Sequence, residues 1–346
     1  MYFQEIRLNW HVLLSGAFGI ALGSSLSHYT LSLFGPPLIK DLGWSRSEFA
    51  LVGSIPLATL LLIPFAGRFV DRFGTKVAAI IGFTAVPLGF VAMSLMSGNL
   101  IEYFAIYLAQ HVFGILTTSL VFCRVVVERF DVARGIALSA TMSAPPLAGA
   151  LAAPFLGGII AEDGWRMGYL ALAAITASGG LIAILLMGRN RRRQPAAETA
   201  PSDSGLLDSG LLDSGPVDSG PAKTALPAAT VTLSRAEFFA MWRNPMLLLV
   251  VTGMMLVNLP QAFASSQLKL VALANGVSDG SATAMVSLYA IGVIVGRFAS
   301  GIALDSKVGP HIVAIVALGL PAVGYLLFAS SVTALPLLMG GVILIG

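Results

Sequence analysis

One arginine lies inside an apolar run, where a positive charge is costly. Arg297 precedes Asp305 by eight residues, so helical geometry puts it roughly 12 Å deeper than the loop at Asp305. An arginine at the centre of a membrane helix costs about 2.5–3.5 kcal/mol, and such residues usually face a bundle interior or a transport pathway. The planar guanidinium can bind a carboxylate through two parallel hydrogen bonds. We therefore favour an anion-binding role for Arg297 over a side chain that snorkels to the interface or braces the loop.

Two other apolar runs contain histidine. His28 and Tyr29 lie in the outer part of the first run, and Gln110 and His111 lie near the middle of the fourth. An imidazole inside a membrane span can carry a proton or bind an anion. A hydrogen-bonded histidine near the interface, with Tyr29 in an aromatic belt, fits the first pair equally well. Hydrogen bonding between helices fits the second pair equally well.

Weaker candidates for a binding cavity lie in the second half of the chain. Asn258 and Gln261 flank Pro260 in the seventh run, and Tyr289 lies in the eighth. Proline breaks the backbone hydrogen-bond ladder and leaves carbonyl groups available to a cavity or a gate.

The elements that position these side chains are membrane helices. The 346 residues are 56% hydrophobic and only 11% charged, and the mean hydropathy is +0.87. Soluble domains carry roughly 25% charged residues. Continuous rather than alternating apolar runs predict helices and not a barrel. The sequence therefore predicts an all-α integral membrane protein.

The composition also argues against other functions. The net charge of +3 comes from basic residues in separate short loops, which does not indicate nucleic-acid binding. The single cysteine, Cys123, excludes an internal disulfide and lies in an apolar run. The sequence shows no catalytic nucleophile and base, no metal-ligand cluster and no nucleotide loop. We predict no enzyme activity, no metal and no cofactor.

Ten spans follow from the apolar runs. They lie near 11–33, 48–67, 76–97, 102–126, 136–160, 167–188, 245–268, 281–303, 310–329 and 332–346. The first run is too long for the apolar part of a cleaved signal peptide. The predicted domains are a six-helix bundle (1–188), a cytoplasmic low-complexity linker (189–236) and a four-span bundle (237–346). Repeats of Ser-Gly-Leu-Leu-Asp at 204–213 mark the linker.

Basic residues predict the orientation in the membrane. With the N-terminus inside, cytoplasmic segments carry Arg68, Arg72, Lys76, Arg129, Arg134, Arg189, Arg191, Arg192, Arg193, Arg235, Arg243 and Lys307. The opposite side carries Lys40, Arg46, Arg166 and Lys269. This excess predicts a multi-pass protein of the inner (plasma) membrane with a cytoplasmic N-terminus.

The segment between the second and third runs carries a recognisable motif. It contains Gly67, Asp71, Arg72, Gly74 and Lys76. The spacing Gly-x-x-x-Asp-Arg-x-Gly-x-Lys resembles the signature between spans two and three of the major facilitator superfamily. A short charged turn that returns in both halves of a hydrophobic chain is typical of a duplicated transporter.

Other segments extend the resemblance along the chain. Gly301 and Asp305 repeat part of the motif, Arg134 and Gly164 flank a segment similar to the family's fifth span, and Ala144-Pro145 resembles its Gly-Pro motif. The resemblance implies the major facilitator fold, two bundles that rock about a midplane cavity, and twelve spans in a complete chain. We therefore expect the chain to be truncated after Gly346.

The family's loop motif implies a gate on the cytoplasmic side. In this gate, Asp71 helps to hold the inner side closed in one state and releases it in the other. The alternative is that these charges only set the orientation in the membrane. We favour the gate, because an acidic residue in a positive loop does not contribute to that orientation signal. Arg124 and Glu128 lie one helical turn apart and are spaced to pair with each other.

One branch of the family is the most similar. Gly296-Arg297-Phe298, together with Gly35-Pro36-Pro37 before Trp44-Ser45, resembles the oxalate:formate antiporter and monocarboxylate porter branch. The resemblance implies that Arg297 anchors a substrate carboxylate. We expect a monomeric carrier in the lipid bilayer that moves a small organic anion with a proton or in exchange for another anion. The alternatives are an exporter of drugs or other metabolites and a non-transporting fragment.

Overall fold

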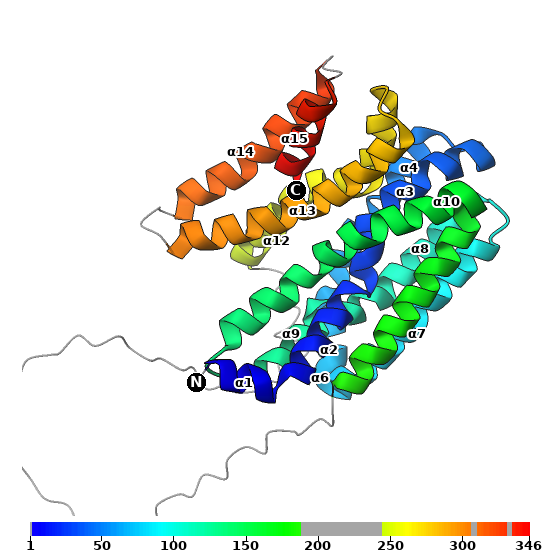
Figure 1. The fold of residues 1–346 in the computed structure, drawn as a ribbon. Coiled ribbons are helices and arrows are strands. Elements are labelled where there is room, and N and C mark those ends of the chain that lie inside the picture. The colour runs from blue at the N-terminus through cyan, green and yellow to red at the C-terminus, as the bar shows by residue number, and fades with distance from the viewer. Residues whose placement is uncertain (1, 188–243, 306–309, 331–333) are drawn as a thin grey trace, which may run out of the picture. The chain divides into compact units, whose positions relative to one another are not determined.

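The computed structural model describes residues 2–187, 244–305, 310–330 and 334–346, which form α-helices and short 3-10 turns (Figure 1). Contacts group Met1–Asn190 and Gly253–Gly346 into one compact unit and Arg191–Thr252 into another. Most of the predicted linker, with its basic residues, lies outside the described residues, as does Lys307. The predicted domain boundaries at 188 and 236 therefore stay a prediction.

Of the first four predicted spans, the third is one continuous helix and the other three are divided into several helical pieces. In chain order, the elements are α1 (Tyr2–Leu8), α2 (Trp10–Ala21), α3 (Ser24–Leu42), α4 (Arg46–Val52), α5 (Ile55–Thr59), η1 (Leu60–Leu62), α6 (Ile63–Phe73), α7 (Thr75–Leu95), α8 (Leu100–Gly114), η2 (Ile115–Thr117) and α9 (Ser119–Val127). The first span thus extends to Leu42 and not 33, with Pro36 and Pro37 inside α3. The second span extends to Phe73 and not 67.

The boundary between the second and third spans has a local cause. The charged segment after Gly67 is the last part of α6, and the break before α7 is Gly74, whose φ of 88° is a conformation that favours glycine. Charged side chains are tolerated at a helix end that reaches the membrane interface, so the motif does not require a longer loop.

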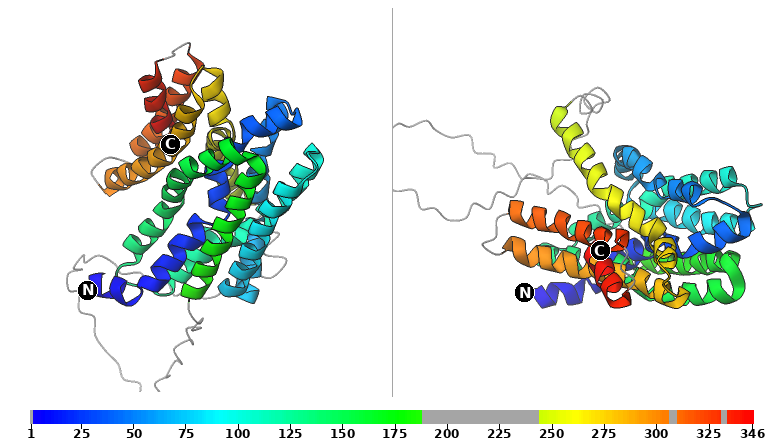
Figure 2. Two further views of the ribbon diagram at one scale, coloured as in Figure 1. Left: turned by 45° about the vertical axis from the view of Figure 1, so that its right-hand side comes forward. Right: turned by 90° about the horizontal axis from the view of Figure 1, so that it is seen from above.

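The fifth and sixth spans form α10 (Arg134–Leu186), which turns sharply at Gly164 with φ 84° and ψ 171°. This confirms two spans separated at Gly164. The remaining helices are α12 (Pro245–Ala274), α13 (Asp279–Asp305), α14 (Pro310–Ala329) and α15 (Leu335–Ile345). The helices α13 and α14 agree with the predicted eighth and ninth spans, α12 extends to Ala274 and not 268, and α15 is shorter than predicted. Figures 1 and 2 show α13, α14 and α15 side by side.

Seven helical stretches of the described residues are long and apolar enough to cross a membrane. One of them is α10, which contains two predicted spans. An all-helical chain with such stretches satisfies its backbone hydrogen bonds internally, as the hydrocarbon core requires. The predicted class of helical integral membrane protein is confirmed.

Small residues bring the first span close to the fourth. A Cβ atom at Gly19 would lie 2.3 Å from the Phe122 ring, and one at Gly23 would lie 2.5 Å from Thr117 Oγ1. Both distances are shorter than real Cβ contacts allow. The glycines therefore let α2 and the start of α3 pack directly on η2 and α9.

Candidate functional site

Three interrupted helices surround a cavity of about 340 Å³. The first span is interrupted between α2 and α3, the second at η1, and the fourth at η2. Residues on both sides of these interruptions line the cavity: Ser24, Ser25, His28, Pro56, Thr59, Leu60, Ile63, His111, Ile115, Thr118, Ser119 and Leu120. Interrupted membrane helices are a common source of binding sites in transporters, because their backbone groups are free to bind ligands or side chains.

Side chains satisfy backbone groups at these interruptions. The Ser24 N–H donates to Thr117 Oγ1 over 2.9 Å. Thr118 begins α9, and its hydroxyl accepts from the Leu120 N–H over 3.4 Å. The hydroxyl groups therefore hold the interrupted helices in register, as capping residues do at helix ends.

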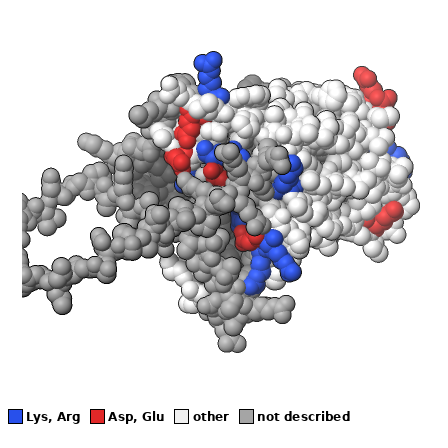
Figure 3. Space-filling model, turned by 90° about the horizontal axis from the view of Figure 1, so that it is seen from below, with Lys and Arg blue, Asp and Glu red and all other residues white. Residues whose placement is uncertain are grey.

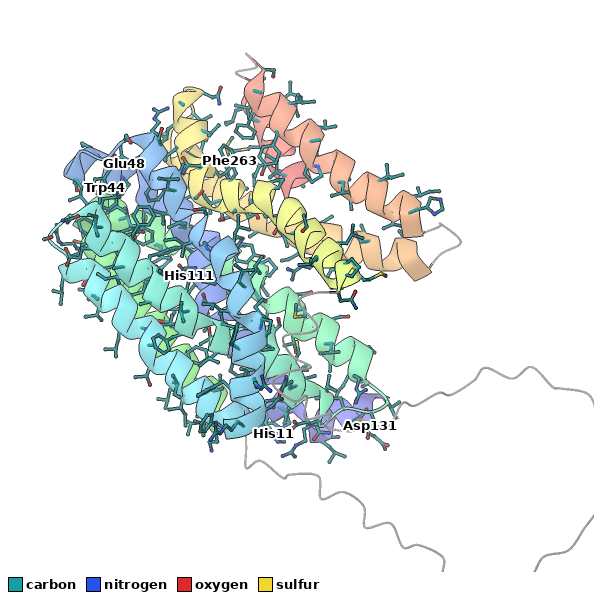
Figure 4. All side chains as sticks on the ribbon, turned by 180° about the vertical axis from the view of Figure 1, so that it is seen from behind. His11, Trp44, Glu48, His111, Asp131 and Phe263 are labelled. Carbon is teal, nitrogen blue, oxygen red and sulfur yellow. The ribbon has the colours of Figure 1, made fainter. Side chains whose placement is uncertain are left out.

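Both predicted histidines contribute to this cavity. His111 is buried, and its Nδ1 lies 3.0 Å from the Tyr107 carbonyl oxygen. A carbonyl can only accept, so Nδ1 carries the hydrogen and Nε2 of the neutral ring is an acceptor. His28 is half-buried on α3. Figure 4 places His111 between the end with Trp44 and Glu48 and the end with His11 and Asp131.

Gln110 has a different environment from its neighbour His111. Its side chain is buried, and Nε2 donates to the Val86 carbonyl of α7 over 2.9 Å. It is not among the residues that line the cavity. Of the two interpretations left open by the sequence, these contacts favour hydrogen bonding between helices for Gln110.

A second group of candidates forms around Tyr29. The Tyr29 ring lies 5.4 Å from the His28 ring and 6.1 Å from the Tyr289 ring, measured between centroids. Both tyrosines are buried, and the Tyr289 hydroxyl has no hydrogen-bond partner among the described residues. Arg297 follows Tyr289 by eight residues on α13, which is roughly 12 Å along a helix. The structure therefore brings His28, Tyr29 and Tyr289 together, and His28 also lines the cavity.

Arg297 itself is exposed and donates from an Nη atom to the Met142 carbonyl oxygen of α10. The described ion pairs are Asp71–Arg124 and Lys269–Asp279, so neither includes Arg297. Lys269 was predicted to lie in a loop, but it is buried in α12 and paired with Asp279 at 3.0 Å. Its charge is compensated there, which explains why a span can hold it.

The seventh-span candidates lie on α12. Gln261 is exposed, and the side chain of Asn258 is outside the described residues. The Pro260 carbonyl accepts from the Tyr325 hydroxyl. A side chain of α14 therefore already binds one backbone carbonyl beside the proline.

The motif residues lie at the junction of α6 and α7. Asp71 pairs with Arg124 of α9, so the predicted pairing of Arg124 with Glu128 is wrong. A partner 53 residues away in sequence replaces the neighbour one turn away, because the Asp71 side chain of α6 reaches the Arg124 side chain of α9. Arg72 lies 5.4 Å over the Phe73 ring, which fits a cation–π contact. Lys76 is half-buried, and a Cβ added at Gly67 would meet nothing within 4 Å.

The segment that joins α9 to α10 is held by two charged side chains. Arg134 donates to the Val127 and Phe130 carbonyls over 3.0 and 3.2 Å, which caps the end of α9. Glu5 accepts from the Asp131 and Ala133 N–H groups, both over 2.7 Å. These two hydrogen bonds hold the pKa of Glu5 below its ordinary value. Gly301 and Asp305 lie on α13, and their side chains are outside the described residues.

Charged side chains of both signs gather at the end of the molecule where α1 lies. Figure 3, seen from the side where α1 lies, shows basic and acidic groups close together beside a broad uncharged surface. Among the described residues, no three His, Cys, Asp or Glu side chains come together to form a possible metal site.

Sequence reasoning missed several hydroxyl groups of the site. Thr59, Thr118 and Ser119 line the cavity, and Ser287 donates from α13 to the Ala150 carbonyl of α10 over 3.0 Å. Their signal in the sequence is a hydroxyl residue close to a proline or glycine within an apolar run. That signal is weak, because serine and threonine are common in membrane helices for other reasons.

Comparisons with known proteins identify the family. Residues 13–346 match the family described as the Major Facilitator Superfamily. The chain is 27% identical over 208 residues to Multidrug resistance protein 2 of Bacillus subtilis (strain 168). The aligned residues cover 58% of this chain and 50% of that protein. The chain thus spans about half the length of that curated relative.

Solved structures show the same fold at low sequence identity. A bacterial homologue of the human lysosomal transporter Spinster, inward-facing and unoccupied, has a TM-score of 0.61 and 15% identity, over 99% of this chain and 72% of that chain. A D-xylose–proton symporter has a TM-score of 0.58 and 16% identity. The match covers 99% of this chain and 80% of the symporter chain. The match over residues 13–346 includes nearly all of the sequence. This chain belongs to the Major Facilitator Superfamily and is a multi-pass membrane protein of that family of transporters.

Proposed function

We propose that this chain is a secondary active carrier of a small organic anion, in particular a monocarboxylate. Arg297 binds the carboxylate, and Tyr29 and Tyr289 line the path beside it. His28 and His111 form a second polar site in the adjoining cavity. Transport proceeds by alternating access, with coupling to a proton or to an exchanged anion. This proposal places the chain in the oxalate:formate and monocarboxylate branch.

The observation that carries this proposal is the environment of Arg297. The residue lies within a membrane span, and its described acceptor is a neutral backbone carbonyl. A guanidinium in a span is expensive unless an acceptor of opposite charge is near. Because the described ion pairs do not include Arg297, an anionic substrate is the partner that would compensate its charge.

The histidine cavity supports coupling to a proton. In the neutral ring, His111 Nε2 is a hydrogen-bond acceptor, and His28 and His111 line the same cavity. Two protonated imidazoles in one small cavity would repel each other. A single proton shared by this site is therefore the species that we expect to move with the anion.

We also propose the orientation and gate that the motif implies. The N-terminus and the Asp71 end of the bundle face the cytoplasm. Asp71 and Arg124 form a latch on that side, and Gly67, Arg72, Gly74, Lys76, Arg134, Gly301 and Asp305 belong to the same gate. The carrier acts as a monomer, with a bundle of residues 1–188, a cytoplasmic linker and a second bundle from residue 237.

Export of drug-like compounds is the second candidate function. The observation that favours it is the 27% identity to a protein named for multidrug resistance. In that case Arg297 has a structural role at the α10–α13 contact, and the substrate need not carry a negative charge.

Proteoliposome transport separates the two functions. The purified chain is reconstituted and tested for uptake of lactate, pyruvate, formate and oxalate under an imposed pH gradient. Lactamide, the neutral analogue of lactate, and ethidium, a lipophilic cation, serve as matched comparisons. Saturable uptake of the carboxylates but not of lactamide supports the anion carrier. Transport of ethidium without carboxylate uptake supports the exporter and rejects the anion proposal.

A further inference from the structure

Three prolines in the first half of α10 leave backbone carbonyls without their usual partners. A proline has no N–H, so the carbonyl four residues earlier in a helix has no intrahelical donor. Pro145 frees the Thr141 carbonyl, Pro146 frees the Met142 carbonyl, and Pro154 frees the Ala150 carbonyl. An unsatisfied carbonyl inside a membrane is costly, and neighbouring helices usually provide the missing donor.

Two of the three freed carbonyls receive a hydrogen bond from α13. Arg297 donates to the Met142 carbonyl, and Ser287 Oγ donates to the Ala150 carbonyl over 3.0 Å. The Ser287 and Arg297 side chains are the described donors from α13 to α10. The two described hydrogen bonds from α13 to α10 thus fall on two of the three carbonyls that proline frees.

A third contact fixes the relative position of the two helices. A Cβ atom at Gly157 would lie 2.6 Å from Thr283 Cγ2, so the backbone of α10 approaches α13 closely there. The pairs 142 with 297, 150 with 287 and 157 with 283 run in opposite directions along the two helices. The α10 and α13 helices therefore pack antiparallel, with contacts over about two turns of α10 on each side of Ala150.

We propose that Pro146 and Pro154 are positioning residues, which turn the Met142 and Ala150 carbonyls into acceptors that hold α13 on α10. Pro146 thereby sets the position of the Arg297 guanidinium. The next step rests on the proposed function: an anionic substrate competes with the Met142 carbonyl for Arg297. Binding of the anion then releases one of the two hydrogen bonds between the helices.

A neutral carbonyl suits this role better than a carboxylate would. A carboxylate would add an opposite charge and a second, parallel hydrogen bond to the guanidinium, whereas a carbonyl is one neutral acceptor. A carboxylate on α10 would hold Arg297 in a strong ion pair and compete with every substrate. The carbonyl satisfies the guanidinium in the absence of substrate and gives way to an anion.

A double-mutant cycle tests the contact without any substrate. Pro146→Ala restores the N–H group that can bind the Met142 carbonyl within α10. In the parent protein, Arg297→Gln is expected to lower Tm in detergent by roughly 2–4 °C. In the Pro146→Ala background the same change is expected to lower Tm by less than half as much. The Pro154→Ala and Ser287→Ala pair is a second, independent cycle with the same expectation.

Pro87→Ala is the matched control, because Pro87 lies inside α7 and, within the described residues, α13 donates no hydrogen bond to the Phe83 carbonyl that it frees. Its effect should add to that of Arg297→Gln. Additive effects in both proline cycles would overturn the proposal that the prolines create the contacts.

The competition is tested by the KM for lactate uptake. If the Met142 carbonyl competes with the substrate, Pro146→Ala should lower this KM about threefold, because a competing hydrogen bond is removed. An unchanged or higher KM would overturn the competition. The two results are separable from the proposed function: coupled proline cycles in a protein that transports no anion would leave the helix contact standing and reject the anion carrier.

Discussion

Glu5 is a single carboxylate that connects the start of the chain to the segment before α10. Its oxygens accept from the Asp131 and Ala133 N–H groups, and these bonds lower its pKa from 4.5. The ionised form therefore stabilises the folded protein at pH values above 4.5. This contribution is lost as the pH falls through the lower pKa of the folded state.

We expect Glu5→Gln to lower Tm at neutral pH and to have little effect in acid. The difference in Tm between the parent and Glu5→Gln should shrink as the pH falls below 4.5, because the parent carboxyl then becomes protonated. Thermal unfolding in detergent over this range measures it. Glu128→Gln, at an exposed glutamate three residues before Asp131, is the control. A difference that stays constant with pH would show that Glu5 does not act through its charge.

Individual residues differ in how far sequence predicts their role. Arg297 is predicted because a charge in an apolar run is unusual, and the structure places it on the same helix as Tyr289, whose ring lies close to that of Tyr29. The partner of Arg124 was predicted wrongly, because spacing along one helix shows only local pairs, whereas Asp71 reaches it from another helix. Ser287 was missed because a single serine in a span carries no pattern.

At the level of elements, the interrupted helices were the least predictable feature. The first, second and fourth predicted spans are helical stretches long and apolar enough to cross a membrane, as expected from apolar length. Apolar length does not predict where each is interrupted, because the interruption at Ser24 depends on the hydroxyl of Thr117, a residue of a different span. Glycines and prolines near the breaks also occur in spans that stay helical, such as Pro87 in α7.

The Asp71–Arg124 contact between α6 and α9 is expected to matter for the rate of transport but little for thermal stability. Both side chains of the Asp71–Arg124 pair are partly exposed, at 64% and 38%, and exposed ion pairs contribute about 0–1 kcal/mol. We expect Asp71→Asn to change Tm by little but to lower the initial rate of transport clearly, because the latch no longer holds one state. Proteoliposome uptake and thermal unfolding of the same preparations measure both.

Exchange of the two charges provides the sharper comparison. Asp71→Arg combined with Arg124→Asp should recover part of the rate that either single change loses. Asp163→Asn, at an exposed position beside Gly164, controls for a loss of negative charge elsewhere. If the double exchange transports no better than the single variants, the pair is not a latch.

For the whole molecule, the distribution of basic residues predicts the orientation in the membrane. Cys123 is the single cysteine, so Cys123→Ser gives a background free of thiols. Asp131 and Ser47 are exposed, and each provides a position for a new cysteine. Figure 4 shows Asp131 at the end of the bundle opposite Trp44 and Glu48.

We expect a membrane-impermeant maleimide to label Ser47→Cys in intact cells and to label Asp131→Cys only in inverted vesicles. The reason is the positive-inside bias of Arg129 and Arg134, which flank Asp131. Labelling of Asp131→Cys in intact cells would reverse the proposed orientation. It would also place the Asp71–Arg124 contact on the outer side.

The central claim is that Arg297 binds the carboxylate of a transported anion, and lactate uptake into proteoliposomes under a pH gradient tests it directly. Loss of hydrogen bonds to a charged group costs about 1.5–3 kcal/mol, which corresponds to roughly a tenfold to hundredfold loss of affinity. We therefore predict that Arg297→Gln removes saturable uptake and that Arg297→Lys, which keeps the charge but not the fork, retains a small part of it. Uptake of lactate by Arg297→Gln at the parent rate would contradict the claim.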